Sequence, residues 1–159
     1  MPELTFDLHV LTARLDRSAD HILQAEYDLS YRRFRTLLTV GRLGSATQRA
    51  VAAELGISEP SASRMTGVLV GTGLLEAVPD PMGGNRRRLT LTPRGEEVVE
   101  QCRTLLENRF ADLVQRSGVS YSGYARDTRR LLAALSAPPE RRSTGSPARD
   151  GRPPATPAQ

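Results

Sequence analysis

Residues 46–75 read ATQRAVAAELGISEPSASRMTGVLVGTGLL, and this stretch decides the fold of the chain. Thr47 can cap a short helix, and Gly56 can end it, because glycine readily adopts the left-handed conformation at a helix end. Ser58 can cap a second helix, which carries an acidic residue and a proline in its first turn, where unpaired amides and the helix dipole favour both. The pattern predicts two short helices joined by a tight turn.

The second helix of this pair has two different faces. At helical spacing, its core side carries four residues: Ala62, Met65, Thr66 and Leu69. The opposite side carries three small residues and one arginine: Pro60, Ser61, Ser63 and Arg64. Such side chains, near the start of a short helix, can approach base edges in a major groove. A helix, a glycine turn and a helix also occur in many all-helical proteins, so this stretch alone leaves the choice open.

The segment that follows favours DNA binding. The pattern predicts a strand at residues 74–78 and a returning strand at residues 86–91. Between them, residues 80–85 are rich in proline and glycine and are predicted to form a turn. A two-stranded ribbon tipped with glycines and flanked by three consecutive arginines is typical of the wing of a winged helix. Asp80 is a candidate partner for a wing arginine on the other strand.

Four longer segments around the winged helix are also predicted to be helical, and we expect Gly41 and Gly44 to end the second of them. The four segments are residues 4–25, 30–43, 92–116 and 120–135. The first has an apolar face: Leu4, Leu8, Leu11, Leu15 and Ile22. The third is expected to bury Val99, Cys102, Leu106, Phe110 and Leu113.

The predicted fold is mainly α with a small β-wing, a winged helix-turn-helix flanked by N- and C-terminal dimerisation helices. We assign residues 1–28 to an N-terminal dimerisation helix, residues 29–95 to a DNA-binding domain and residues 96–136 to C-terminal dimerisation helices. The long terminal helices carry more apolar surface than a small winged helix can cover, which favours a homodimer. Residues 137–159 lack apolar periodicity and are predicted to be a disordered tail. The tail carries a net charge of +2, and either adds non-specific attraction to DNA or has no role.

The composition narrows the classes of function. The formal net charge of +4 and the pI of about 10.0 favour a polyanionic partner weakly. All 22 basic residues are arginines, so a phosphate-binding loop that needs lysine and any Schiff-base mechanism are excluded. One cysteine and two histidines cannot form an intrachain disulfide or a multi-cysteine zinc site. We find no catalytic constellation, no metal site, no cofactor motif, no membrane span and no signal peptide, and expect a cytoplasmic protein.

With this order of elements, the sequence resembles the MarR family of bacterial transcriptional regulators from residue 4 to residue 135. The most specific parts of the resemblance are LGISEPSASRMTGVLVGTGLLE and PDPMGGNRRRLTLTPRGEEV. The resemblance implies a homodimer whose first and last helices interlock, and whose two winged helices read a near-palindromic operator. It also implies a repressor that loses DNA affinity when a small phenolic or lipophilic effector binds in a cleft between the dimerisation and DNA-binding parts.

The resemblance also suggests the residues that meet DNA. Base reading and phosphate contact in the major groove would fall to Pro60, Ser61, Ser63 and Arg64. Thr47 and Gln48 would meet phosphates, and Arg86 would enter the minor groove, with Arg87 as the alternative. The chain departs from the family where an Asp-Arg pair is common, because Gly67 and Val68 stand there, and it lacks the Asp-x-Arg wing signature.

The sequence says little about sensing. Cys102 lies on an apolar helix face, which favours a buried, inert thiol over a redox switch. His9 and His21 do not share a helix face well, so structural or surface roles are favoured over a metal site. Phe34 and His9 can line the cleft by position, although most aromatic residues at such spacing are simply core residues. The arginines at 32, 33 and 35 form either a solvated face or a functional one.

Two other classes of function stay open beside the DNA-binding regulator. The first is a winged-helix protein-interaction module whose basic wing grips an acidic protein partner. The second is an enzyme, which the sequence disfavours because it contains no nucleophile elbow, no His-Glu-x-x-His helix and no glycine-rich nucleotide loop.

Overall fold

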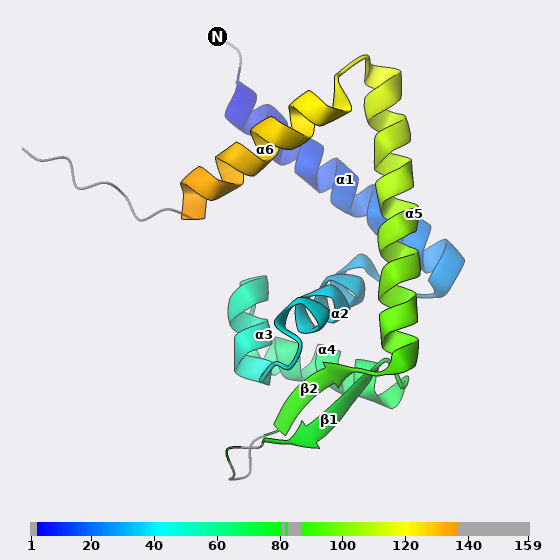
Figure 1. The fold of residues 1–159 in the computed structure, drawn as a ribbon, viewed down its shortest axis with the longest axis vertical. Helices are drawn as coiled ribbons and strands as arrows, with labels where there is room; N and C mark the ends of the chain where they lie inside the picture. The colour runs from blue at the N-terminus through cyan, green and yellow to red at the C-terminus, as the bar shows by residue number, and fades with distance from the viewer. Residues whose placement is uncertain (1–2, 81, 83–86, 137–159) are drawn as a thin grey trace, which may run out of the picture. The chain divides into compact units, whose positions relative to one another are not determined.

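In the computed structural model, which describes residues 3–80, 82 and 87–136, the chain is mainly helical with one two-stranded sheet (Figure 1). The helices and strands are α1 (Leu4–Tyr27), α2 (Tyr31–Leu43), α3 (Gln48–Leu55), α4 (Glu59–Gly71), β1 (Leu75–Pro79), β2 (Arg87–Leu91), α5 (Pro93–Ser117) and α6 (Tyr121–Ser136). The described residues fall into two compact units, one within residues 1–118 and the other within residues 119–159. The predicted mainly α fold with a β-wing is confirmed.

The helix-turn-helix is built by the local signals that the sequence contains. The Thr47 side chain accepts a hydrogen bond from the amide of Ala50 at 3.1 Å, which caps α3. Gly56 ends α3 with φ of 64°, in the left-handed region that favours glycine. The Ser58 hydroxyl accepts from the Ser61 amide at 3.4 Å and caps α4. Each of these caps gives a backbone group at a helix end the partner that the helix itself cannot provide.

The wing is a short antiparallel pair joined to the helix-turn-helix by a bridge. The strand register pairs Leu75 with Leu91 and Pro79 with Arg87. Ala46 exchanges two backbone hydrogen bonds with Leu89, at 3.0 and 2.7 Å, so the start of the helix-turn-helix is fixed to β2. This bridge sets the position of the wing relative to α3.

α5 begins directly after the wing, and its first turn lies against Leu74, the residue before β1. The Thr92 hydroxyl accepts from the Gly95 amide at 3.0 Å and caps this helix. A Cβ at Gly95 would lie 2.0 Å from the Leu74 carbonyl oxygen. Glycine is therefore required here, because the helix approaches the backbone of the chain too closely for any side chain.

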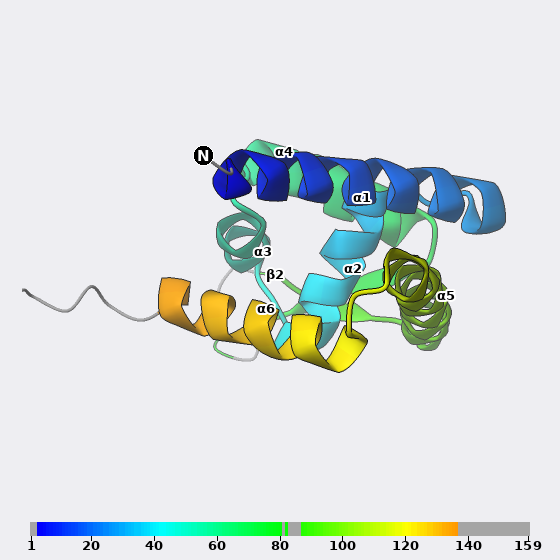
Figure 2. The same cartoon turned by 90° about the horizontal axis from the view of Figure 1, so that it is seen from above.

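The core of the first unit surrounds α2. In the ribbon views α2 lies at the centre of this unit, with its other helices around it (Figures 1 and 2). Fully or nearly fully buried side chains come from almost every element of the unit: Leu23, Leu37, Val40, Val51, Ala62, Leu69, Leu75 and Cys102. The winged helix, the end of α1 and α5 therefore share one core.

The predicted apolar face of α1 is covered only in part, and the predicted buried face of α5 is wrong at one position. Leu4 and Leu8 are 64% and 40% exposed, while Leu23, which the predicted face omitted, is fully buried. The chain turns back into α2 directly after α1, so the last turns of α1 pack and its first turns do not. In α5 the same kind of shift leaves Leu113 38% exposed and buries Val114.

Gly41 does not end α2, contrary to the prediction. The helix continues to Leu43, and Gly44 follows it as the cap. A Cβ at Gly41 would lie 2.8 Å from the Leu91 Cδ1 atom. The glycine instead allows α2 to approach β2 closely.

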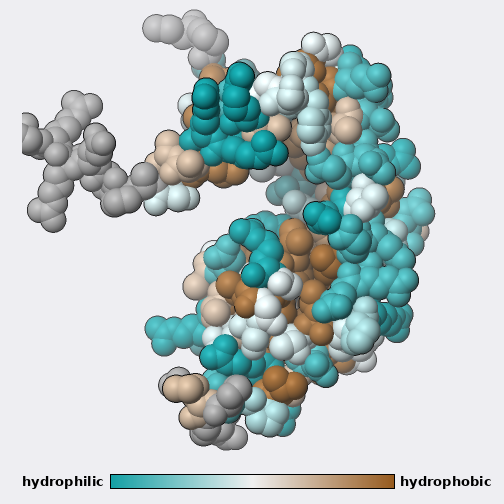
Figure 3. Space-filling model, viewed as in Figure 1, coloured by the Kyte–Doolittle hydropathy of each residue, from teal (hydrophilic) through white to brown (hydrophobic). Residues whose placement is uncertain are grey.

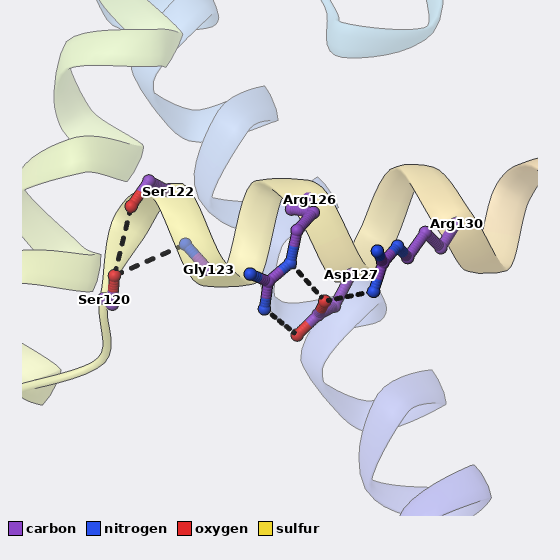
Figure 4. A network of polar contacts seen from close by, with 6 residues as sticks. All are labelled: Ser120, Ser122, Gly123, Arg126, Asp127 and Arg130. Atoms are coloured by element: carbon purple, nitrogen blue, oxygen red, sulfur yellow. Dashed lines mark hydrogen bonds and ion pairs between the residues drawn. The ribbon is translucent and has the colours of Figure 1, made fainter.

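α6, described by itself, is an exposed amphipathic helix. The Ser120 hydroxyl accepts from the Gly123 amide at 3.3 Å, and Asp127 pairs with Arg126 at 2.9 Å and with Arg130 at 3.9 Å (Figure 4). No residue of α6 is buried. Three leucines of α6 are 58% exposed or more: Leu131, Leu132 and Leu135. Within the described residues no helix is long and apolar enough to cross a bilayer.

Candidate nucleic-acid interface

α4 presents one buried face and one open face. Ala62 and Thr66 are fully buried and Leu69 is 1% exposed, while Met65 is half-buried. The opposite face has three exposed side chains and one half-buried side chain, that of Ser61. The three exposed positions are Pro60, Ser63 and Arg64. The division between the two faces agrees with the sequence prediction.

Arg64 is held along the open face of α4 by a short chain of hydrogen bonds. The Ser58 hydroxyl donates to the Ser61 Oγ at 3.0 Å, and the Arg64 Nη2 donates to the same oxygen at 3.3 Å. The cap of the helix therefore orients the guanidinium that the sequence selected for base reading. A restrained arginine loses less conformational entropy when it binds than a free one.

α4 is anchored on α2 from beneath. The Thr36 hydroxyl donates to the Arg32 carbonyl at 3.0 Å and contacts the Met65 sulfur at 3.8 Å. Thr36 is fully buried and Met65 is half-buried, so this contact lies at the edge of the core. The position of the open face of α4 thus depends directly on the position of α2.

The two phosphate candidates at the start of α3 differ in their environment. Thr47 is half-buried and its oxygen already accepts the capping hydrogen bond, although its hydroxyl proton remains a donor. Gln48 is exposed. Arg49 of α3 and Glu59 of α4 approach each other to 3.9 Å, both mostly exposed, and so connect the two helices weakly.

The root of the wing contains a buried carboxylate. Asp80 is 8% exposed, and its Oδ1 accepts from the Arg88 Nε at 3.2 Å and from the Met82 amide at 3.1 Å. The prediction that Asp80 braces an arginine of the other strand is confirmed. The sequence did not indicate that Arg88 would be the one. Arg87 is exposed at the start of β2, and Arg86 lies outside the described residues.

A groove of about 410 Å³ lies between α1, α2 and α5 of the first unit. Its apolar walls include Leu15 and Ile22 of α1, Tyr31 and Phe34 of α2, and Leu106 and Phe110 of α5. Figure 3 shows hydrophobic side chains gathered over α2, beside the long helix α5. Phe34 lines the groove as predicted, whereas His9 is exposed and outside its lining.

Charged groups of both signs stand at this groove. Three arginines and two carboxylates are among its lining: Arg103, Arg109, Arg116, Asp16 and Glu107. Burial, and to a smaller degree the Asp16 carboxylate, raise the pKa of Tyr31, while Arg35 lowers it. The Tyr31 hydroxyl therefore stays protonated at neutral pH and can donate a hydrogen bond.

The described residues contain no group of histidine, cysteine and acidic side chains that could hold a metal ion. Cys102 is a free, fully buried cysteine, and burial raises the pKa of its thiol to about 11. A thiol in this state is a poor nucleophile, as the prediction of an inert cysteine requires. His9 and His21 are both exposed.

This order of helices, with a ribbon between α4 and α5 and an open α4 face, defines a winged-helix protein. Residues 27–84 match the family model of the MarR family. Over these residues the chain is similar to the MarR family, in agreement with the resemblance found in the sequence.

Solved structures share the fold over most of the chain. A crystal structure of a mutant MarR from E. coli is 21% identical, with a TM-score of 0.74 over 85% of this chain and 98% of that one. The same mutant protein complexed with operator DNA is 20% identical, with a TM-score of 0.70 over 86% of this chain and 95% of that one. RV1404 from Mycobacterium tuberculosis is 25% identical, with a TM-score of 0.70 over 87% and 97%. No curated protein matches the chain by sequence.

Proposed function

We propose that the protein is a sequence-specific DNA-binding transcriptional regulator. The observation that carries this proposal is the open face of α4, where Arg64 is held against Ser61 beside a wing with an exposed arginine. A recognition helix of this kind fits a major groove, and an adjacent basic wing fits the minor groove. The likeness to MarR of E. coli complexed with operator DNA supports the proposal.

The proposed contacts are of two kinds: some position the protein on the DNA, and the others read the DNA sequence. Thr47 and Gln48 meet phosphates at the start of α3, and one of Arg86 and Arg87 enters the minor groove and reads its width. Base edges in the major groove are met by the open face of α4: Pro60, Ser61, Ser63 and Arg64. A bidentate base contact by arginine contributes about 1–3 kcal/mol of discrimination.

We propose further that the regulator acts as a homodimer on a pseudo-palindromic operator. Large apolar side chains are exposed on both terminal helices, at Leu4 and Phe6 in α1 and at Leu135 in α6. A second copy that covers them would make residues 1–28 and 96–136 the dimerisation parts, beside the DNA-binding part at 29–95. The two half-sites would then lie about 10 base pairs apart.

The groove between α1, α2 and α5 is the proposed effector site. Its apolar walls, its volume of about 410 Å³ and the Tyr31 hydroxyl suit a small lipophilic or phenolic molecule. Because α4 is anchored on α2 through Thr36 and Met65, a ligand that displaces α2 also displaces the DNA-facing helix. The proposed regulator, a repressor, would therefore release DNA when the effector binds.

Binding of the full chain to short duplexes, measured by fluorescence anisotropy, tests the proposal. The wild-type protein should prefer one sequence, and Arg64→Ala should relax that preference. A matched Arg17→Ala variant, which removes an exposed arginine of α1, should keep it. Binding of an acidic protein partner together with indifference to every duplex would replace the regulator by a protein-interaction module.

A further inference from the structure

A second hollow lies between the start of α2 and the first turns of α4, with a volume of about 260 Å³. We call it the arginine recess. Its lining residues are Ser30, Arg32, Arg33, Ser61, Arg64 and Met65. Ser61 and Arg64 also belong to the open face of α4, so the recess continues the proposed DNA-facing surface onto another helix.

The recess gathers positive charge that no carboxylate balances. Three of its six lining residues are arginines, and none is acidic. Within the described residues, none of these three arginines forms an ion pair; Arg64 donates only to the Ser61 hydroxyl. Three guanidinium groups in one hollow repel one another, and an anion held between them would remove that repulsion.

The backbone that carries the recess is fixed before any ligand binds. The Ser30 hydroxyl accepts from the Arg33 amide at 3.3 Å, and the Asp20 carboxylate of α1 accepts from the Tyr31 amide at 2.8 Å. On the other side, Met65 is tied to α2 through its contact with Thr36. Arg32 and Arg33 on α2, and Arg64 on α4, are thus positioned by two helices that pack on the same core.

We propose that the arginine recess binds a phosphodiester group of the DNA backbone, which makes the start of α2 a further DNA-contacting element beside α3, α4 and the wing. The inference rests on the proposed function. A duplex whose major groove receives α4 has its backbone at the edge of that groove, where Arg32 and Arg33 lie next to Arg64. Guanidinium groups bind phosphate oxygens through paired hydrogen bonds, and the contact carries no sequence preference.

The test is the salt dependence of DNA binding by the full chain. Each phosphate contact adds about 0.9 to the slope of log Kd against log salt for duplex DNA. Because each recess holds one phosphodiester group and the proposed homodimer has two recesses, the double variant Arg32→Gln with Arg33→Gln should lower the slope by about 2 and leave the ranking of operator sequences unchanged. Arg17→Gln removes one exposed charge elsewhere and should leave the slope as it is. Arg33→Lys keeps the charge and should keep the slope, with weaker binding at every sequence.

Three results would overturn the inference, and they are distinguishable. An unchanged slope in the double variant, with steep wild-type binding, would remove α2 from the interface and leave the regulator intact. An unchanged slope together with calorimetric binding of inorganic phosphate that the double variant loses would assign the recess to a free anion. A wild-type protein that binds no duplex would overturn the proposed function itself. Thermal unfolding of each variant at the wild-type temperature shows that the fold is kept.

Discussion

Two hollows on opposite faces of α2 differ in what they offer a ligand. The effector groove is lined by Tyr31 and Phe34 on an apolar wall and by charges of both signs. The arginine recess is lined by Arg32 and Arg33 with no acidic residue. Binding in the groove would draw its free energy from buried apolar area, which salt affects little. Binding in the recess would draw it from charge, which salt screens strongly. α2 therefore separates an apolar site from a charged one, and the salt dependence of ligand binding distinguishes the two sites.

The largest expected effect comes from removing a core side chain of α2, the helix that both hollows share. Phe34 is 3% exposed and stacks on Tyr31, with ring centroids 6.2 Å apart. Phe34→Ala should lower the free energy of unfolding by about 3–5 kcal/mol, because it leaves a cavity in the core. Urea denaturation followed by circular dichroism measures it. Tyr31→Phe keeps the ring and is the control; a loss below about 1 kcal/mol in Phe34→Ala would mean that α2 is not the centre of the core.

A paired arginine sharpens the contrast with the unpaired ones in the recess. Arg88 at the wing root forms an ion pair, because its Nε lies 3.2 Å from the Asp80 Oδ1. The Asp80 partner is only 8% exposed. Asp80→Asn should destabilise the protein by about 1–2 kcal/mol, since Arg88 loses its partner but keeps some access to water. Glu76→Gln in β1, an exposed position on the strand that leads to Asp80, is the matched control and should change the unfolding free energy by less than about 0.5 kcal/mol. Equal effects of the two substitutions would contradict the structural role of Asp80.

The effector groove should respond to apolarity and hardly to salt. Leu106 lines the groove and is half-buried in the free protein. Leu106→Gln should weaken the binding of a phenolic ligand about 10-fold, since the apolar contact is worth about 1–2 kcal/mol. DNA affinity without ligand should stay at its wild-type value. Calorimetry with a panel of phenols at two salt concentrations measures both; ligand affinity that falls as steeply with salt as DNA affinity would erase the difference between the hollows.

The smallest effect is expected at a site that belongs to neither hollow. Burial raises the pKa of the Cys102 thiol to about 11, above that of the unfolded chain, so the protonated form is favoured by folding. The stability that this contributes is present at neutral pH and is lost as pH rises toward 11. At pH 8 the native thiol should react with a disulfide reagent far more slowly than the unfolded one, and mild oxidant should leave DNA affinity unchanged. Rapid labelling of the native protein would contradict the burial of this residue.

The fold could be predicted from the sequence because its decisive signals are local. Thr47, Gly56 and Ser58 act on backbone groups within four residues of themselves, so their roles are readable in one stretch. The burial of Leu23, the exposure of Leu4 and the position of Gly41 inside α2 could not be predicted in this way. They depend on which turns of a helix meet other elements, and that is decided by contacts between segments distant in sequence.

In the candidate site, too, the features that follow from local sequence could be predicted, and those that depend on contacts between distant segments could not. The open face of α4 follows from helical spacing alone, and the structure places Pro60, Ser63 and Arg64 there. The choice of Arg88 as the partner of Asp80 depends on strand register, which three consecutive arginines leave ambiguous. The arginine recess depends on how α2 crosses α4, so the sequence alone favoured a solvated face for the same arginines.

Selection of bound DNA from a random duplex pool by the full chain is the most direct measurement of the central claim, that the open face of α4 reads DNA sequence. The account predicts enrichment of a near-palindrome with half-sites about 10 base pairs apart, and loss of enrichment at the positions that Arg64 reads when Arg64→Ala is used. A pool that remains random after selection with the wild-type protein, or an identical enriched sequence with Arg64→Ala, would contradict it.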